Sequence, residues 1–145
     1  MDLEPYLITS AVRGIMAQRL VRKICTHCRE AYTPVSSLNA QFGYTLPNKI
    51  YRGAGCTHCN NTGYDGRVPI FELLIPDETI SQMVMHRASA SEIRMYAVEN
   101  GLVETLRFHG LKLIKDGITS VEEVMMKTEK DELAVQFIES EINHI

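Results

Sequence analysis

A chain of 145 residues is long enough for one domain, or for a helical domain with a small satellite, and its net charge of −3 argues against nucleic-acid binding. Its hydrophobic fraction of 45% permits a packed core, and a charged fraction of 23% is ordinary for a soluble protein. No apolar run approaches the roughly 20 residues of a membrane-spanning helix, and nothing resembles a signal peptide. We therefore expect a cytosolic protein with reduced thiols, in which four cysteines indicate a metal site rather than disulfides.

The first predicted element is a long amphipathic helix over residues 5–23. Pro5 suits the first turn of a helix, where a backbone N–H has no partner in any case. Gly14 costs about 1 kcal/mol there relative to alanine, which suggests close backbone packing. Apolar residues recur at helical spacing, namely Leu7, Ile8, Ala11, Val12, Ile15, Met16 and Leu20. Basic residues lie in or beside the polar face, namely Arg13, Arg19, Arg22 and Lys23.

Residues 25–66 show no sustained period. They contain prolines, glycines and all four cysteines, a composition typical of a loop-rich module with short hairpins. A short helix is predicted within them, over residues 35–43. Residues 67–75 are rich in apolar and β-branched side chains and predict a strand, which Pro69 would confine to a sheet edge or a bulge.

The chain after Pro76 is predicted to be helical. Asp77 can cap one helix, and Ser89 with Glu92 forms a capping box, in which each side chain satisfies a free N–H at the start of the next. That second helix should end at Asn100, before Gly101.

Three more helices complete the prediction. One spans residues 103–116, one begins at a capping box of Thr119 and Glu122 and runs to about Lys127, and the last covers 129–143. The expected fold is α+β and mainly α, with a long N-terminal helix, a small zinc-bound module, one or two short strands and a C-terminal helical bundle. The predicted divisions are 1–24, 25–66, 67–128 and 129–145.

The spacing of the cysteines carries the chemistry. Cys25 and Cys28 form one Cys-Thr-His-Cys pair, and Cys56 and Cys59 form a second. A two-residue gap lets both sulfurs of a pair face one point, so two such knuckles supply the four thiolates that Zn²⁺ binds tetrahedrally, at about 2.3 Å each. All four positions are then filled by protein, so we predict a structural site without a reactive water.

Energy and charge agree with that prediction. Structural zinc supplies on the order of 10–16 kcal/mol in small modules, and this becomes folding free energy. A segment of about 40 residues with few buried aliphatic side chains needs such help. Nearby basic residues can offset the charge of a zinc tetrathiolate, namely Arg22, Lys23, Arg29 and Arg52.

Other interpretations of the cysteines stay open. Two disulfides would require an oxidising compartment, and a thioredoxin-like dithiol uses one Cys-x-x-Cys pair rather than two. A mononuclear iron or iron–sulfur site uses the same ligands. His27 and His58 lie inside the knuckles, where sulfurs already converge, so exposed loop histidines are favoured over further ligands.

Several stretches resemble the C-terminal end of the ATPases of type II secretion and type IV pilus assembly. The tetracysteine frame follows Ala-Gln-Arg-Leu-Val-Arg and precedes Gly-Tyr-x-Gly-Arg, a combination specific to that family. The matching runs are Gly14–Cys28, Gly55–Arg67, Ile70–Leu74, Thr105–Leu106, Gly110–Leu111 and Gly117–Val124. Thr26 and Thr57 stand where the family commonly has proline, and Pro69 replaces a usual glycine; these departures affect loop detail and remove no ligand.

The resemblance implies a non-catalytic C-terminal region of such a motor. Members hydrolyse ATP with Mg²⁺ in a core N-terminal to this region, and no phosphate-binding loop occurs here. They assemble as hexamers on the cytoplasmic side of the inner membrane and move a platform protein, so neighbouring subunits and that protein are the implied partners, with no nucleic acid.

The resemblance also implies roles for three arginines. Arg67 matches the arginine of Gly-Tyr-x-Gly-Arg, which lies near the nucleotide in the family, and its forked guanidinium suits phosphate oxygens. Arg19 and Arg22 are implied as nucleotide-proximal or subunit-contact residues. The alternative for all three arginines is that they are ordinary solvent-exposed surface residues. A freestanding zinc ribbon that binds nucleic acid or protein, and a redox protein, are the competing functions.

Overall fold

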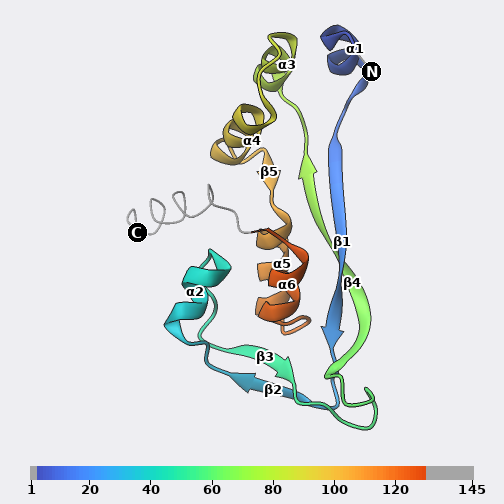
Figure 1. The fold of residues 1–145 in the computed structure, drawn as a ribbon, viewed down its shortest axis with the longest axis vertical. Helices are drawn as coiled ribbons and strands as arrows, with labels where there is room; N and C mark the ends of the chain where they lie inside the picture. The colour runs from blue at the N-terminus through green and yellow to red at the C-terminus, as the bar shows by residue number, and fades with distance from the viewer. Residues whose placement is uncertain (1–2, 130–145) are drawn as a thin grey trace.

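The computed structural model describes residues 3–129, and within that range it confirms an α+β fold. In this described part of the chain, six helices accompany two small antiparallel sheets, one with the strand order β1-β4-β5 and one with β2-β3. Figure 1 shows β1 and β4 side by side along the long axis of the molecule. The prediction of one or two short strands was too low, because the pairing that creates the others joins distant parts of the chain.

The long N-terminal helix is wrong. Helix α1 covers only Pro5–Ala11, and the chain then forms strand β1, Ile15–Ile24. Every residue of Ile15–Arg22 has a Cα partner in β4, Tyr64–Leu74, so the hydrogen bonds of this segment are made with residues far along the sequence. Apolar residues spaced for a helix are tolerated in the strand because its open face leaves several of them exposed.

The predicted strand over 67–75 is confirmed, as the longer β4. Its residue Pro69 lies opposite Leu20 of β1. The N–H of Phe71 points away from β1, toward the ring of His109. Alternate residues of a strand share a side, so the missing N–H of Pro69 also falls on the side away from β1. Strand β5, Val103–Glu104, pairs only with Leu73 and Leu74, and Pro69 thus removes no ladder bond.

The small sheet closes the segment around the cysteines. Strands β2, Arg29–Tyr32, and β3, Ile50–Gly53, pair in antiparallel register. Helix α2, Ser36–Phe42, connects them and confirms the short helix predicted for 35–43. It ends at Gly43, whose φ of 86° is the left-handed conformation that glycine adopts without strain.

Two of the predicted helix starts are confirmed by their caps. Helix α3, Glu78–Met85, begins at Asp77, whose carboxylate accepts from the N–H of Ile80. Helix α4, Ala90–Glu99, begins at Ser89 with the full capping box. Both caps use side chains within three residues of the groups they satisfy, and local sequence is therefore enough to predict them.

The next two helices differ from the prediction at their starts. Helix α5 is Leu106–Lys115, capped by Thr105, because Val103 and Glu104 pair with β4 instead. Helix α6 is Val121–Lys127, capped by Ser120 rather than by Thr119. The helix expected over 129–143 lies outside the described residues, apart from its first position.

The hydrophobic core joins α2 and the β2-β3 sheet to α5 and α6. Its buried members are Phe42, Tyr44, Leu46, Ile50, Leu111, Ile114, Val121 and Val124. The C-terminal helices pack as two pairs, α3 with α4 and α5 with α6, and only the second pair covers this core. No helix within residues 3–129 is long and apolar enough to cross a membrane.

Candidate metal centre

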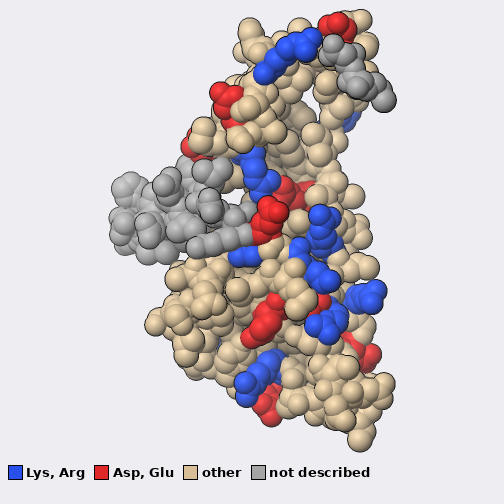
Figure 2. Space-filling model, in the orientation of Figure 1, with Lys and Arg blue, Asp and Glu red and all other residues tan. Residues whose placement is uncertain are grey.

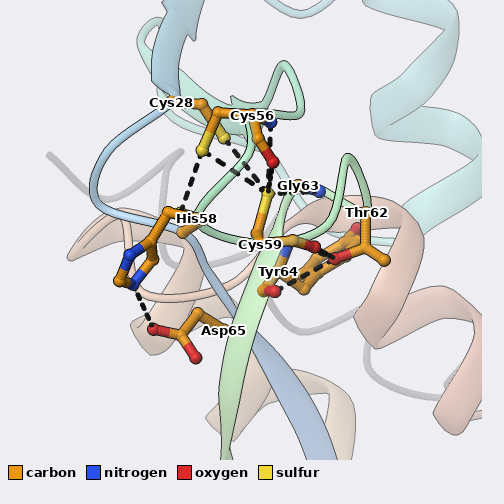
Figure 3. Close-up of polar contacts among 9 residues, drawn as sticks. Cys28, Cys56, His58, Cys59, Thr62, Gly63, Tyr64 and Asp65 are labelled. Atoms are coloured by element: carbon orange, nitrogen blue, oxygen red, sulfur yellow. Dashed lines mark hydrogen bonds and ion pairs between the residues drawn. The ribbon is translucent and has the colours of Figure 1, made fainter.

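The four cysteines come together at one end of the long β1-β4 pair. Cys25 directly follows β1, Cys28 directly precedes β2, and Cys56 and Cys59 lie in the turn between β3 and β4. Their sulfur atoms all lie within 4.8 Å of one another. The chain positions that the sequence singled out are therefore adjacent in space, as Figure 3 shows for three of them.

The spacing of the sulfurs fits a tetrahedral ion. The Sγ–Sγ distances are 3.9 Å for Cys25–Cys56, 3.8 Å for Cys28–Cys59 and 3.7 Å for Cys56–Cys59. A tetrahedron with metal–sulfur bonds of about 2.3 Å has edges of about 3.8 Å. A disulfide needs about 2.05 Å between sulfurs, and all four thiols are free. The group can therefore hold a metal ion, and four thiolates favour zinc.

Backbone N–H groups point at the sulfurs and prepare them for a cation. Cys59 Sγ accepts from the N–H of Cys56 at 3.3 Å and from that of Gly63 at 3.2 Å. Burial alone would raise the pKa of Cys59, but these two bonds, together with the contacts to the sulfurs of Cys56 and Cys28, outweigh it and lower that pKa to about 6. The thiol of Cys59 therefore loses its proton more readily than that of Cys25 or Cys28.

The first knuckle behaves in the opposite way. Burial raises the pKa of Cys28 to about 12, although the N–H of Gly55 donates to its sulfur at 3.3 Å. Burial also raises the pKa of Cys25. A bound cation supplies the missing positive charge and displaces such protons, so metal binding at this site releases protons.

Glycines allow the two knuckles to approach. The carbonyl of Gly63 accepts from the N–H of Cys25 at 2.9 Å, and its own N–H donates to Cys59, so this one residue joins both knuckles. Its φ of 77° is left-handed. A methyl group on Gly53 would collide with the backbone of Gly63, and both positions therefore require the absence of a side chain.

Neither histidine belongs to the sulfur group. The rings of His27 and His58 lie with their centroids 4.0 Å apart. His58 Nε2 is 3.4 Å from a carboxylate oxygen of Asp65, and Figure 3 shows its ring turned from the sulfurs toward that residue. Within residues 3–129 the group of possible metal ligands contains the four cysteines alone.

The basic residues expected to offset the charge of the centre mostly have other partners. Arg29 donates to the carbonyl of Gly117 and lies over the ring of Tyr51, and Arg52 forms an ion pair with Glu30. These arginines therefore offset the charge of the sulfur group only indirectly. The backbone N–H groups of Gly55, Cys56 and Gly63 donate directly to the sulfurs.

The three predicted arginines have separate environments. Arg22 binds Glu123 with Nε and Nη2, at 2.9 and 2.8 Å, and its guanidinium lies 4.1 Å from the ring centre of Tyr64. Arg67 lies directly opposite Arg22 in the strand register and has no side-chain partner within residues 3–129. Arg19 donates to the carbonyl of Gln18. The sheet thus places Arg22 and Arg67 together and Arg19 nearer its middle.

Sequence reasoning missed Glu123. Its side chain is 1% exposed, and its carboxylate binds both the guanidinium and the backbone N–H of Arg22. Burial would raise the pKa of Glu123, but the bonds to Arg22 outweigh it and lower that pKa. In the sequence it looked like an ordinary first-turn residue of a helix, because its partner stands 101 positions away.

Comparisons with known proteins agree with these observations. The sequence pattern of the family described as "Type II/IV secretion system protein" matches residues 1–126. The chain is 38% identical over 132 residues to the type IV pilus assembly ATPase PilB of Thermus thermophilus, covering 88% of this chain and 15% of that protein. It is 37% identical over 132 residues to the type II secretion system ATPase E of Vibrio cholerae, covering 90% and 26%.

A third relative is the type IV pilus assembly ATPase TfpB of Acinetobacter baylyi, 33% identical over 130 residues, with 86% and 22% covered. The chain thus spans between 15% and 26% of the length of these three relatives.

Proposed function

This chain belongs to the family of type II/IV secretion system proteins, and from that premise we propose that it is a non-catalytic, zinc-binding C-terminal region of a secretion or pilus assembly ATPase. The observation that carries the proposal is the set of four sulfurs spaced as a zinc tetrathiolate requires. Four protein ligands leave no position for water, so the ion stabilises the fold rather than performing a reaction.

Metal analysis tests the zinc centre directly. Protein purified without chelator should contain one zinc per chain, and replacing Cys56 with serine should abolish that stoichiometry. His58→Ala is the matched control, because it alters the same knuckle and removes no sulfur, and it should retain the metal. Absence of stoichiometric metal from the wild-type chain would refute the proposal. Finding iron together with acid-labile sulfide would show that the site holds an iron–sulfur cluster instead of zinc.

The proposed partners are neighbouring ATPase subunits and the inner-membrane platform protein, reached from the cytoplasmic side. An open apolar face on the β1-β4 pair supports a role in protein contacts. Met16 and Leu73 lie directly opposite each other on it and are 62% and 46% exposed, with Leu20, 46% exposed, further along. Replacing Met16 and Leu73 together with serine should weaken assembly of the full-length ATPase without removing zinc from it; unchanged assembly would exclude this face.

Nucleic acid is not a proposed partner. The net charge is −3, and Figure 2 shows Lys and Arg side chains interspersed with Asp and Glu side chains on the face that it presents. Nucleic-acid-binding domains usually concentrate positive charge on one face. Salt-dependent binding of labelled nucleic acid by the zinc-loaded chain would overturn this part of the proposal.

Arg67 is the residue proposed to approach nucleotide, with Arg22 opposite it in the strand register. Arg19 pairs with Ile70 on the other face of the sheet and is proposed as a subunit-contact residue. The guanidinium of Arg67 is exposed and has no acidic partner within the described residues, so it is available to an anion, whereas the guanidinium of Arg22 opposite it is already paired with Glu123. In the full-length ATPase, Arg67→Ala should lower ATP turnover, whereas Arg13→Ala, a change to another basic residue of the same region, should not. Equal turnover for both variants would exclude the role.

A further inference from the structure

Buried polar side chains gather beside the candidate metal centre, on the connection between α5 and α6 and in the first turn of α6. Thr119, Ser120 and Glu123 are each exposed by no more than 1%. Buried polar and charged groups are costly unless they are bonded, so the positions of their partners show what these side chains hold. We refer to residues 117–123 as the clamp segment.

Besides the cap bond from the N–H of Glu123 to Ser120, the bonds of these three side chains reach residues close to a cysteine. The hydroxyl of Thr119 donates to the carbonyl of Arg22 at 2.8 Å. The carboxylate of Glu123 accepts from the N–H of Arg22 at 3.0 Å and from its guanidinium. The hydroxyl of Ser120 lies 2.7 Å from that of Tyr64, the residue after Gly63. The clamp segment thus holds the chain before Cys25 and the chain after the second knuckle.

The same place is where β1 leaves its regular pairing. The register with β4 shifts between Arg22 and Ile24, and the N–H of Ile24 donates instead to the carbonyl of Ile118 at 2.8 Å. A shift of this kind bends a strand and redirects the side chains that follow. Because Cys25 is the next residue, this departure from the strand pairing, held by the clamp segment, lies directly before the first sulfur of the group.

From these contacts we propose that the clamp segment is a positioning element of the metal centre, with Glu123 as its principal residue, so that metal affinity and the docking of α6 are coupled. The inference rests on the proposed zinc binding. Coupling of this kind is reciprocal: if the docked clamp strengthens metal binding, the bound metal must stabilise the docked clamp by the same factor. Helix α6 would then report whether the centre is filled.

Two glutamate substitutions distinguish a role in positioning the metal site from a general effect on the stability of the fold. Glu123→Gln keeps the shape of the side chain and removes the charge that binds Arg22. Glu72→Gln is the matched control: Glu72 bonds Arg94 and the N–H of Leu106, remote from the cysteines. Tyr64→Phe, which loses only the hydroxyl that meets Ser120, is a second variant if Glu123→Gln fails to fold.

The experiment measures zinc affinity by competition with a chelator and hydrogen exchange of residues 117–127 with and without zinc. Glu123→Gln should lower zinc affinity about tenfold, within the range usual for coupled sites, and should alter the visible spectrum of the Co²⁺-loaded chain. Glu72→Gln should change neither. Removing zinc from the wild-type chain should speed exchange in residues 117–127 and leave α4 unaffected.

Each outcome bears on a separate claim. The coupling would be overturned, with the metal site left intact, by equal zinc affinity for the two glutamine variants. It would also be overturned if hydrogen exchange in residues 117–127 were the same with and without zinc. A wild-type chain that binds no zinc would instead overturn the proposed function. The coupling is supported only if the affinity change and the exchange change occur together.

Discussion

Replacing Gly53 with alanine tests how closely the two knuckles must approach. An added methyl carbon would lie 2.6 Å from both Cα and C of Gly63 and closer still to its carbonyl oxygen. Carbon atoms pack at about 3.5–4.0 Å, so the two backbones would have to separate by roughly 1 Å. Neither can move freely, because Gly63 donates to Cys59 and accepts from Cys25.

The magnitude follows from those contacts. Overpacking at a rigid site costs about 1–3 kcal/mol, and the two hydrogen bonds of Gly63 contribute about 1 kcal/mol each. We therefore expect Gly53→Ala to lose about 3–5 kcal/mol of unfolding free energy. For a chain of this size that lowers the melting temperature by roughly 10–15 °C.

Urea unfolding and thermal melting of the zinc-loaded chain, with metal analysis, measure the loss. Gly101→Ala is the control: its φ of 65° is also unfavourable for alanine, but nothing lies within 4 Å of the added methyl. It should cost only about 1–2 kcal/mol and leave zinc binding intact. A Gly53→Ala chain as stable as wild type, with full zinc content, would refute the close approach of the knuckles.

Three further outcomes are expected. Replacing any one of the four cysteines with serine should fray residues 25–66 while circular dichroism retains most of the helix, since α3 and α4 pack on each other outside the core that α5 and α6 share with residues 42–50, and α5 and α6 keep their own caps; collapse of the helical signal would contradict this. The pKa of Glu123 is lowered in the folded state, so its stabilisation is full above the ordinary carboxyl pKa and is lost as pH falls through the folded value. Urea unfolding from pH 6 down to about pH 3 should therefore show a steeper loss for wild type than for Glu123→Gln, and parallel curves would count against it. The chain alone should show no ATP turnover. Activity above background that cannot be traced to a contaminating ATPase would contradict this expectation.

Local chemistry explains which parts of the fold could be predicted. Asp77 and Ser89 satisfy backbone groups within three residues of themselves, and their helices begin where the sequence indicates. The spacing of the cysteines is equally informative, because a two-residue gap already brings two sulfurs to one point. The convergence of Cys25, Cys28, Cys56 and Cys59 is the part of the candidate site that the sequence predicted.

The errors arise where a segment takes its hydrogen bonds from far away. Residues 15–24 carry a helical spacing of apolar side chains, yet β4 supplies their partners and makes them a strand. Val103 and Glu104 likewise leave the predicted helix to pair with β4. Periodicity within a short window cannot detect such partners, since it reports one face of an isolated element.

The sequence by itself determined that the four cysteines form one group able to hold a metal, the caps of α3 and α4, and the family. Only the tertiary structure decided that β1 is a strand, that Glu123 is buried against Arg22, and that the connection between α5 and α6 supports the chain around Cys25. The physical reason is distance along the chain. A cap or a knuckle is closed by neighbours, whereas a strand pair or a buried ion pair exists only once folding has brought remote residues together.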